Sequence, residues 1–159
     1  MRVTVTADDA ARGEMSLTEI SAKVAPIPAV GDTPMLAFRR ADGSNATLKD
    51  FHGRNTVVHF WASWCGPCKQ QLPGLRRLRE RYAANELSIL GLSLDHDASA
   101  WQTALKHLDL SWPQGRLSAA ADTGVSSVPA YWLLDPAGKI IAKAYDADEL
   151  ATAVAKRLK

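Results

Sequence analysis

The sequence predicts one α/β domain, with a mixed central sheet, helices on both faces of that sheet and an added N-terminal β-hairpin. Two runs predict the centre of the sheet, because residues 57–61 and 87–94 are apolar on both faces of a strand, as in interior strands that helices cover. Apolar residues at helical spacing separate these runs, so a parallel crossover is expected. Two further short runs, 131–134 and 140–144, are joined by a turn with Pro and Gly and predict an antiparallel hairpin.

Three helices are expected from apolar spacing and from polar residues at their starts. Asp97 is the expected N-cap of the second helix, and Asp146 with Glu149 resembles a capping box at the start of the last. Pro73 is expected to kink the first helix, since it removes one backbone hydrogen bond. The inward-facing residues are Leu72, Leu75, Leu78 and Tyr82 in the first helix, Trp101, Leu105 and Leu108 in the second, and Leu150, Val154 and Leu158 in the last.

Residues 1–30 are interpreted as an extension or linker and residues 31–159 as the domain. A short helical pattern at 16–24 ends before two prolines, and nothing in the extension carries chemistry. Asp42-Gly43 predicts the turn of the N-terminal hairpin, between extended runs at 35–38 and 44–48. The segment 109–127 is expected to be irregular, with a helical turn around 119–123.

Composition excludes several classes of protein. The formal net charge is only +2, and the arginines at positions 76, 77, 79 and 81 fit a solvated helix face, so nucleic-acid binding is not expected. Two cysteines cannot build a framework of several disulfides, and the four histidines show no ligand spacing. We therefore expect neither a metal nor an organic cofactor. The polar N-terminus lacks the apolar core of a signal peptide, which leaves a cytoplasmic protein or a chain that begins after its targeting segment.

Cys65 and Cys68 are the candidate catalytic residues. They flank Gly66-Pro67 directly after the apolar run 57–61, where a helix is expected to begin. Free backbone N–H groups at a helix start favour the thiolate of the first cysteine, while Gly66 allows a tight turn and Pro67 presets a helical φ. A purely structural disulfide is the weaker interpretation, because so short a loop constrains the unfolded chain little. Cys65 is thus the expected nucleophile and Cys68 the resolving thiol of a thiol–disulfide exchange.

Two segments resemble the thioredoxin superfamily. Residues 60–69, Phe-Trp-Ala-Ser-Trp-Cys-Gly-Pro-Cys-Lys, are similar to its active-site motif, and residues 127–139, beginning Ser-Val-Pro-Ala-Tyr-Trp, are similar to the segment that holds its cis-proline. Gly-Asp-Thr-Pro at 31–34 and Leu-Lys-Asp-Phe-His-Gly-Arg at 48–54 resemble the TlpA/ResA branch of extracytoplasmic reductases. The resemblance covers most of the domain and implies the thioredoxin fold.

The resemblance also implies a role for residues around the cysteines. It predicts a cis Val128–Pro129 bond that faces the sulfurs, with the Val128 backbone free to pair with an extended substrate. Trp64 is expected as an exposed lid, whereas Trp61, Trp101 and Trp132 are expected in the core. The implied activity is that of a monomeric protein-disulfide reductase. Its partners would be a disulfide-bearing protein and an upstream thiol donor, and a missing N-terminal segment would have to provide any membrane anchor.

Two positions depart from the family pattern. His59 stands where thioredoxins carry a buried Asp, and Gln71 stands where ResA-like reductases often carry a Glu. The usual proton acceptor for Cys68 is therefore absent. His59 has two interpretations: a neutral core histidine, or the proton acceptor that replaces the missing carboxylate.

Two other functions are open to the same sequence. A thiol peroxidase would require a Thr-x-x-Cys environment with an upstream proline, which residues 63–65 do not supply. A redox-inactive docking module would use the fold only to bind a partner, and the retained cysteine pair argues against it.

Overall fold

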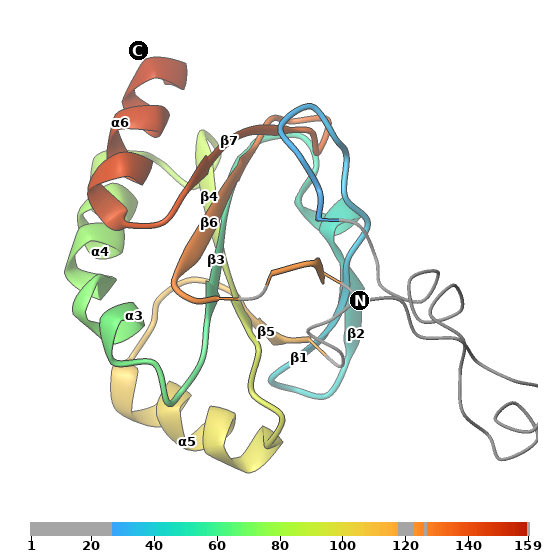
Figure 1. Cartoon of the computed structure of the whole chain (residues 1–159), viewed down its shortest axis with the longest axis vertical. Helices are drawn as coiled ribbons and strands as arrows, with labels where there is room; N and C mark the ends of the chain where they lie inside the picture. Colours follow the sequence, from blue (N-terminus) through green and yellow to red (C-terminus); the bar gives the residue numbers. More distant parts are fainter. Residues whose placement is uncertain (1–26, 118–122, 126, 159) are drawn as a thin grey trace, which may run out of the picture.

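The computed structural model describes residues 27–117, 123–125 and 127–158. It has the expected class, a mixed α/β domain, with a seven-stranded sheet in the order β2-β1-β5-β4-β3-β6-β7 (Figure 1). The expected helix at 16–24 lies outside the described residues, as do residues 119–122 of the expected helical turn. The description that follows therefore concerns the domain alone.

The centre of the sheet is the pair of strands that the sequence predicts. β3 (Asn55–Trp61) and β4 (Leu87–Ser93) pair in parallel, and every residue of β4 is buried. β6 (Ala130–Leu134) pairs antiparallel with the other side of β3 and continues into an antiparallel hairpin with β7 (Ile140–Ala144). Because β3 has a strand on each side, the residue that follows it is held at a fixed place on the sheet's edge.

The segment 109–127, expected to be irregular, contains a strand. β5 (Gln114–Arg116) pairs in parallel with β4, and its other edge pairs antiparallel with β1 (Ala37–Arg40). β1 in turn pairs antiparallel with β2 (Asn45–Thr47), so the N-terminal hairpin extends the main sheet. A three-residue strand of Gln, Gly and Arg has no apolar alternation that could reveal it, and its pairing depends on its neighbours. Gly115 allows β5 to pair with β1, because a Cβ at this position would overlap the ring of Phe38.

The helix after the active-site loop is interrupted, as Pro73 predicts. α3 (Gly66–Gln70) ends at Gln71, and α4 (Leu72–Arg81) starts immediately after it. α4 buries its leucines against the sheet beside α6 (Ala147–Arg157), which begins at Asp146, where the carboxylate accepts from the Glu149 N–H at 2.8 Å. Figure 1 shows α3, α4 and α6 together on one side of the sheet.

Two further helical segments, a 3-10 helix and a longer α-helix, pack against other parts of the sheet. On the opposite face, the short 3-10 helix η1 (Leu48–Phe51) packs its two terminal residues into the cluster that contains Val58 and Phe60. α5 (Ala98–Leu108) begins at its expected cap Asp97 and packs Trp101 beside Trp61. The same cluster contains both cysteines, so α5 closes the end of the sheet at which the candidate site lies.

Candidate active site

The two cysteines form a disulfide at the start of α3. Their Cα atoms lie 5.4 Å apart, and Cys65 and Cys68 are 3% and 1% exposed. Cys65 is the N-cap of α3, and its Sγ accepts a hydrogen bond from the Cys68 backbone N–H at 3.2 Å. Hydrogen bonding to the charged form favours that form, so this contact would stabilise a Cys65 thiolate in the reduced protein.

The local chain positions Cys65 through a turn at the end of β3. The Cys65 N–H donates to the Ala62 carbonyl at 3.0 Å, which reverses the chain within four residues. Pro67 lies in the first turn of α3, where its missing N–H leaves no intrahelical bond unmade. Strand, turn and helix start thus fix the position of Cys65 Sγ at the end of a buried strand.

Residues from distant parts of the chain border the disulfide. Trp64 is 70% exposed, whereas Trp61, Trp101 and Trp132 are buried, as the sequence predicts. The Val128–Pro129 peptide bond is cis, and Val128 packs against the cluster of Cys65 and Cys68. Gly66 and Pro67 are exposed beside it. The structure therefore brings the predicted site residues together, while their roles toward a substrate stay predictions.

His59 lies in the middle of β3, on the face that packs against α4 and α6. Its side chain is 1% exposed, and its ring stacks on that of Tyr131 in β6, with centroids 4.9 Å apart. Neither ring nitrogen has a hydrogen-bond partner among the described residues. Burial penalises the charged imidazolium and lowers the pKa of His59 from 6.5 to about 3. The ring is consequently neutral near pH 7.

Gln71 is tied to the same tyrosine. The Tyr131 hydroxyl donates to Gln71 Oε1 at 2.5 Å, across the break between α3 and α4. Burial, together with the negative charge of Asp146, raises the pKa of Tyr131 well above its ordinary value, so the hydroxyl keeps its proton. At the position where related reductases often carry Glu, this chain thus has a neutral amide that accepts a hydrogen bond.

A buried carboxylate that sequence reasoning missed lies beside the loop before Cys65. Asp95 is 3% exposed, and it accepts hydrogen bonds from the Ser63 backbone N–H at 3.0 Å, the Ser63 hydroxyl at 2.6 Å and the Ser93 hydroxyl at 2.5 Å. A signal was available, because β3 and β4 are parallel and their carboxyl ends meet at one edge. Ser63 follows β3 by two residues, and Asp95 follows β4 by two.

The described residues meet neither the requirements of a metal site nor those of a membrane-spanning helix. Within residues 27–117, 123–125 and 127–158, no group of three or more His, Cys, Asp or Glu side chains could bind a metal ion. In the described part of the chain, no helix has the length and apolar character to cross a bilayer.

Comparison with known proteins identifies the family. The Redoxin family model matches residues 26–156. The chain belongs to the Redoxin family. Within it, the chain is a TlpA/ResA-like member of the thioredoxin superfamily: it is 28% identical over 115 residues to a thiol-disulfide oxidoreductase ResA of Bacillus cereus. It is also 28% identical over 112 residues to the thioredoxin-like protein YneN of Bacillus subtilis (strain 168).

Coverage of these Redoxin-family relatives is unequal. The matches cover 70% and 67% of this chain but 66% and 65% of the two relatives, so the chain spans just under two thirds of their length. A solved thioredoxin domain of a Bacteroides vulgatus thiol-disulfide oxidoreductase superposes with a TM-score of 0.75 at 27% identity, covering 82% of this chain and 99% of that one. A thiol-disulfide oxidoreductase from Bacteroides fragilis NCTC 9343 superposes at 0.70 and 31% identity, covering 79% and 98%. The thioredoxin fold of this Redoxin-family chain is thus confirmed.

The neutral state of His59 predicts a pH-dependent stability. As pH falls, the unfolded ring binds its proton near pH 6.5 and the folded ring only near pH 3. The stability that the neutral His59 ring contributes is therefore complete above pH 6.5 and is lost as pH falls toward 3. Between pH 7 and pH 5, His59 should lower the free energy of unfolding by about 2 kcal/mol. Urea unfolding of the oxidised wild type and of His59→Leu at both pH values measures it.

The decrease in the free energy of unfolding between pH 7 and pH 5 should be smaller in His59→Leu than in the wild type by about 2 kcal/mol. The exposed His107→Ala variant is the matched control and should lose as much as the wild type. Equal losses in the wild type and in His59→Leu would contradict the burial of a neutral ring.

Proposed function

We propose that this protein is a thiol–disulfide oxidoreductase that reduces protein disulfides through Cys65 and Cys68. The observation that carries the proposal is the cysteine pair at the start of α3, in which the Cys68 N–H donates to the sulfur of Cys65. Val128 packs against the apolar cluster that contains both cysteines. The names of the ResA-type relatives and of the Bacteroides structures support the same activity.

The proposed cycle transfers two electrons and two protons. In the reduced protein, the Cys65 thiolate attacks one sulfur of the substrate disulfide, forms a mixed disulfide and releases the other substrate sulfur, which takes a proton from water. Cys68 then gives its proton to a base and attacks Cys65 Sγ, and the substrate sulfur that leaves takes up one proton from that base or from water. This second attack breaks the mixed disulfide, releases the second substrate thiol and leaves the Cys65–Cys68 disulfide. An upstream dithiol donor returns the protein to its reduced form by the same chemistry in reverse.

We propose that the substrate lies along the Val128 backbone. Pro129 has no N–H to donate, so an extended substrate segment would pair with the groups of Val128, as in strand addition. The exposed ring of Trp64, the residue before Cys65, offers apolar contact to such a segment. A Cβ added at Gly66 would meet no atom within 4 Å, so the space over this neighbour of Cys65 is open. A flexible protein segment is the substrate that fits this arrangement.

The compartment and the assembly are also part of the proposal. We propose a monomer that works outside the cytoplasm, as the resemblance to the TlpA/ResA branch and the similarity to ResA suggest. A disulfide-bearing protein is its substrate, and a membrane-bound or soluble thiol protein is its electron donor. Disulfides persist in such oxidising compartments, where a dedicated reductant has substrates to act on.

The division of labour between the cysteines is tested by two variants. Cys68→Ser should form a mixed disulfide with insulin, a protein that contains disulfides, and stop there, because the resolving thiol is gone. Cys65→Ser should form almost none, since Cys68 is the more deeply placed sulfur. Non-reducing mass spectrometry of the quenched mixtures measures the adduct. Equal adduct formation by the two variants would contradict the assignment of nucleophile and resolving thiol.

We further propose His59 as the proton acceptor for Cys68. The ring is neutral near pH 7, so a nitrogen lone pair is free to take a proton. The lowered pKa is that of the ring in the oxidised protein. A Cys68 thiolate that forms within reach of the ring would raise this pKa, because an opposite charge favours the imidazolium. The packing role of the ring against Tyr131 is the competing explanation.

Rapid-mixing kinetics separate the two roles of His59. His59→Leu should form the mixed disulfide at nearly the wild-type rate but resolve it roughly 10²-fold more slowly, the usual loss for a general base. His59→Asp restores the acid of thioredoxins and should recover much of the resolution rate. Unchanged resolution in a folded His59→Leu protein would assign the residue to packing alone.

A further inference from the structure

A buried hydrogen-bond cluster joins the end of β4 to the loop that carries the nucleophile. We call it the Asp95 clasp; it consists of Ser63, Ser93 and Asp95. Both carboxylate oxygens are used, because Oδ1 accepts the Ser63 hydroxyl and Oδ2 accepts the Ser63 N–H and the Ser93 hydroxyl. The Asp95 N–H donates in return to Ser93 Oγ at 2.9 Å. The carboxylate therefore has little freedom to move away from the loop.

Within the described part of the chain, the three groups that donate to the Asp95 carboxylate are all neutral. Two are hydroxyls and one is a backbone amide, whereas the guanidinium of Arg116 in β5 donates to the Asp95 backbone carbonyl at 3.3 Å rather than to the carboxylate. Hydrogen bonds from neutral groups stabilise a carboxylate without cancelling its charge. A buried negative charge is screened far less than one in water. Its field consequently reaches the neighbouring loop.

We propose that Asp95 is a positioning residue that tunes Cys65: through Ser63 it holds the loop before the nucleophile, and its fixed negative charge opposes the formation of the Cys65 thiolate. This inference rests on the proposed function, since it assigns Cys65 the role of nucleophile. Ser63 is the link, because it is bound to Asp95 by two hydrogen bonds and precedes Cys65 by two residues.

Two opposing influences then set the reactivity of Cys65. The Cys68 N–H stabilises the thiolate and lowers the thiol pKa, while the Asp95 charge raises it. A thiolate whose thiol has a higher pKa is intrinsically more nucleophilic, and a reduced form that is less stabilised makes the protein a stronger reductant. The clasp would thus keep the protein on the reducing side, which the proposed activity requires.

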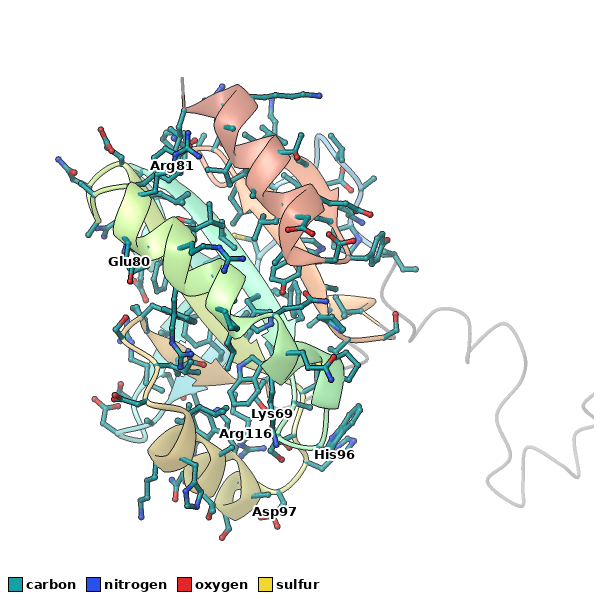
Figure 2. All side chains as sticks on the ribbon, turned by 90° about the vertical axis from the view of Figure 1, so that its left-hand side faces the viewer. Lys69, Glu80, Arg81, His96, Asp97 and Arg116 are labelled. Atoms are coloured by element: carbon teal, nitrogen blue, oxygen red, sulfur yellow. A yellow bond between two sulfur atoms is a disulfide. The ribbon has the colours of Figure 1, made fainter. Side chains whose placement is uncertain are left out.

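Other charged or titratable groups also face this end of the molecule and act on Cys65 in every variant. They are Lys69 in α3, His96 and Asp97 in the loop before α5, His107 in α5 and Arg116 in β5. The neutral ring of His59 lies in the middle of β3. Lys69, Asp97 and His107 line one cleft with Ser63. Figure 2 labels Lys69, His96, Asp97 and Arg116 at the end of the molecule where α3 and α5 lie. Because these groups are retained, a change at Asp95 alone isolates its charge.

The test is the pH dependence of Cys65 alkylation in the reduced protein. Rates of iodoacetamide labelling at Cys65, read by peptide mass spectrometry, give the pKa of this thiol. In Asp95→Asn the charge is lost, and the amide can still bond to Ser63 and Ser93, because hydroxyls accept as well as donate. The midpoint should fall by about 0.5–1 pH unit, the effect of removing a nearby like charge.

Two controls separate charge from structure. Ser63→Ala keeps the carboxylate and removes one hydroxyl, so the midpoint should not fall. Thr56→Val removes a buried hydroxyl bond to the Phe51 carbonyl at the far end of β3, so it should cost stability and leave the midpoint unchanged. If Asp95→Asn does not fold, Asp95→Ser carries the same charge change.

An unchanged midpoint in a folded, neutral Asp95 variant would overturn the proposal, as would an equal fall in Thr56→Val. Labelling by iodoacetamide needs no disulfide substrate. A wild-type protein that fails to reduce protein disulfides would therefore contradict the proposed function, and it would leave the measured effect of Asp95 on the thiol standing.

Discussion

The hydrogen bond from the Cys68 N–H to Cys65 Sγ is the interaction on which the site depends, because it exists only if a helix begins at the point where the strand delivers the sulfur. β3 supplies that place, held between β4 and β6. Trp101 and Ala104 of α5 share a buried cluster with the two cysteines, and Val128, in the loop before β6, packs against that cluster. The rest of the domain holds one turn of backbone in position. Reactivity at this turn is a property of the fold as well as of two thiols.

The buried polar groups around the turn are arranged unlike those expected from the family pattern. Where thioredoxins carry a buried acid beneath the resolving cysteine, this chain has neutral His59, and Gln71 accepts a hydrogen bond from Tyr131 in place of a carboxylate. The buried carboxylate is instead Asp95, at the end of β4 and bound to the loop before the nucleophile. The negative charge is thus bound to Ser63, two residues before Cys65. In our account this arrangement weakens the Cys65 thiolate and leaves proton removal from Cys68 to an imidazole.

Much of the fold could be predicted because the informative signals are local. Val58 and Phe60 on one strand face and Val57 on the other mark β3 as interior, and Asp97 marks the start of α5. β5 could not be predicted, since Gln114–Arg116 is a strand only through its partners β1 and β4. The Asp95 clasp was missed although the parallel pairing of β3 and β4 could be predicted, because Ser63 and Asp95 are 32 residues apart and the register of the two strands brings them together. Spacing within one motif finds the cysteines, and contacts between strands need the structure.

The measurement that tests the central claim most directly is the stoichiometry of a single turnover. Fully reduced protein is mixed with a limiting protein disulfide without oxygen, the thiols are quenched with acid, and both partners are weighed by mass spectrometry. The account predicts one intramolecular Cys65–Cys68 disulfide formed for each substrate disulfide lost, with two substrate thiols gained. Two results would contradict the account. One is loss of the Cys65 and Cys68 thiols without any gain of substrate thiols. The other is no reaction with the protein disulfide in a reduced protein that rapidly consumes added peroxide.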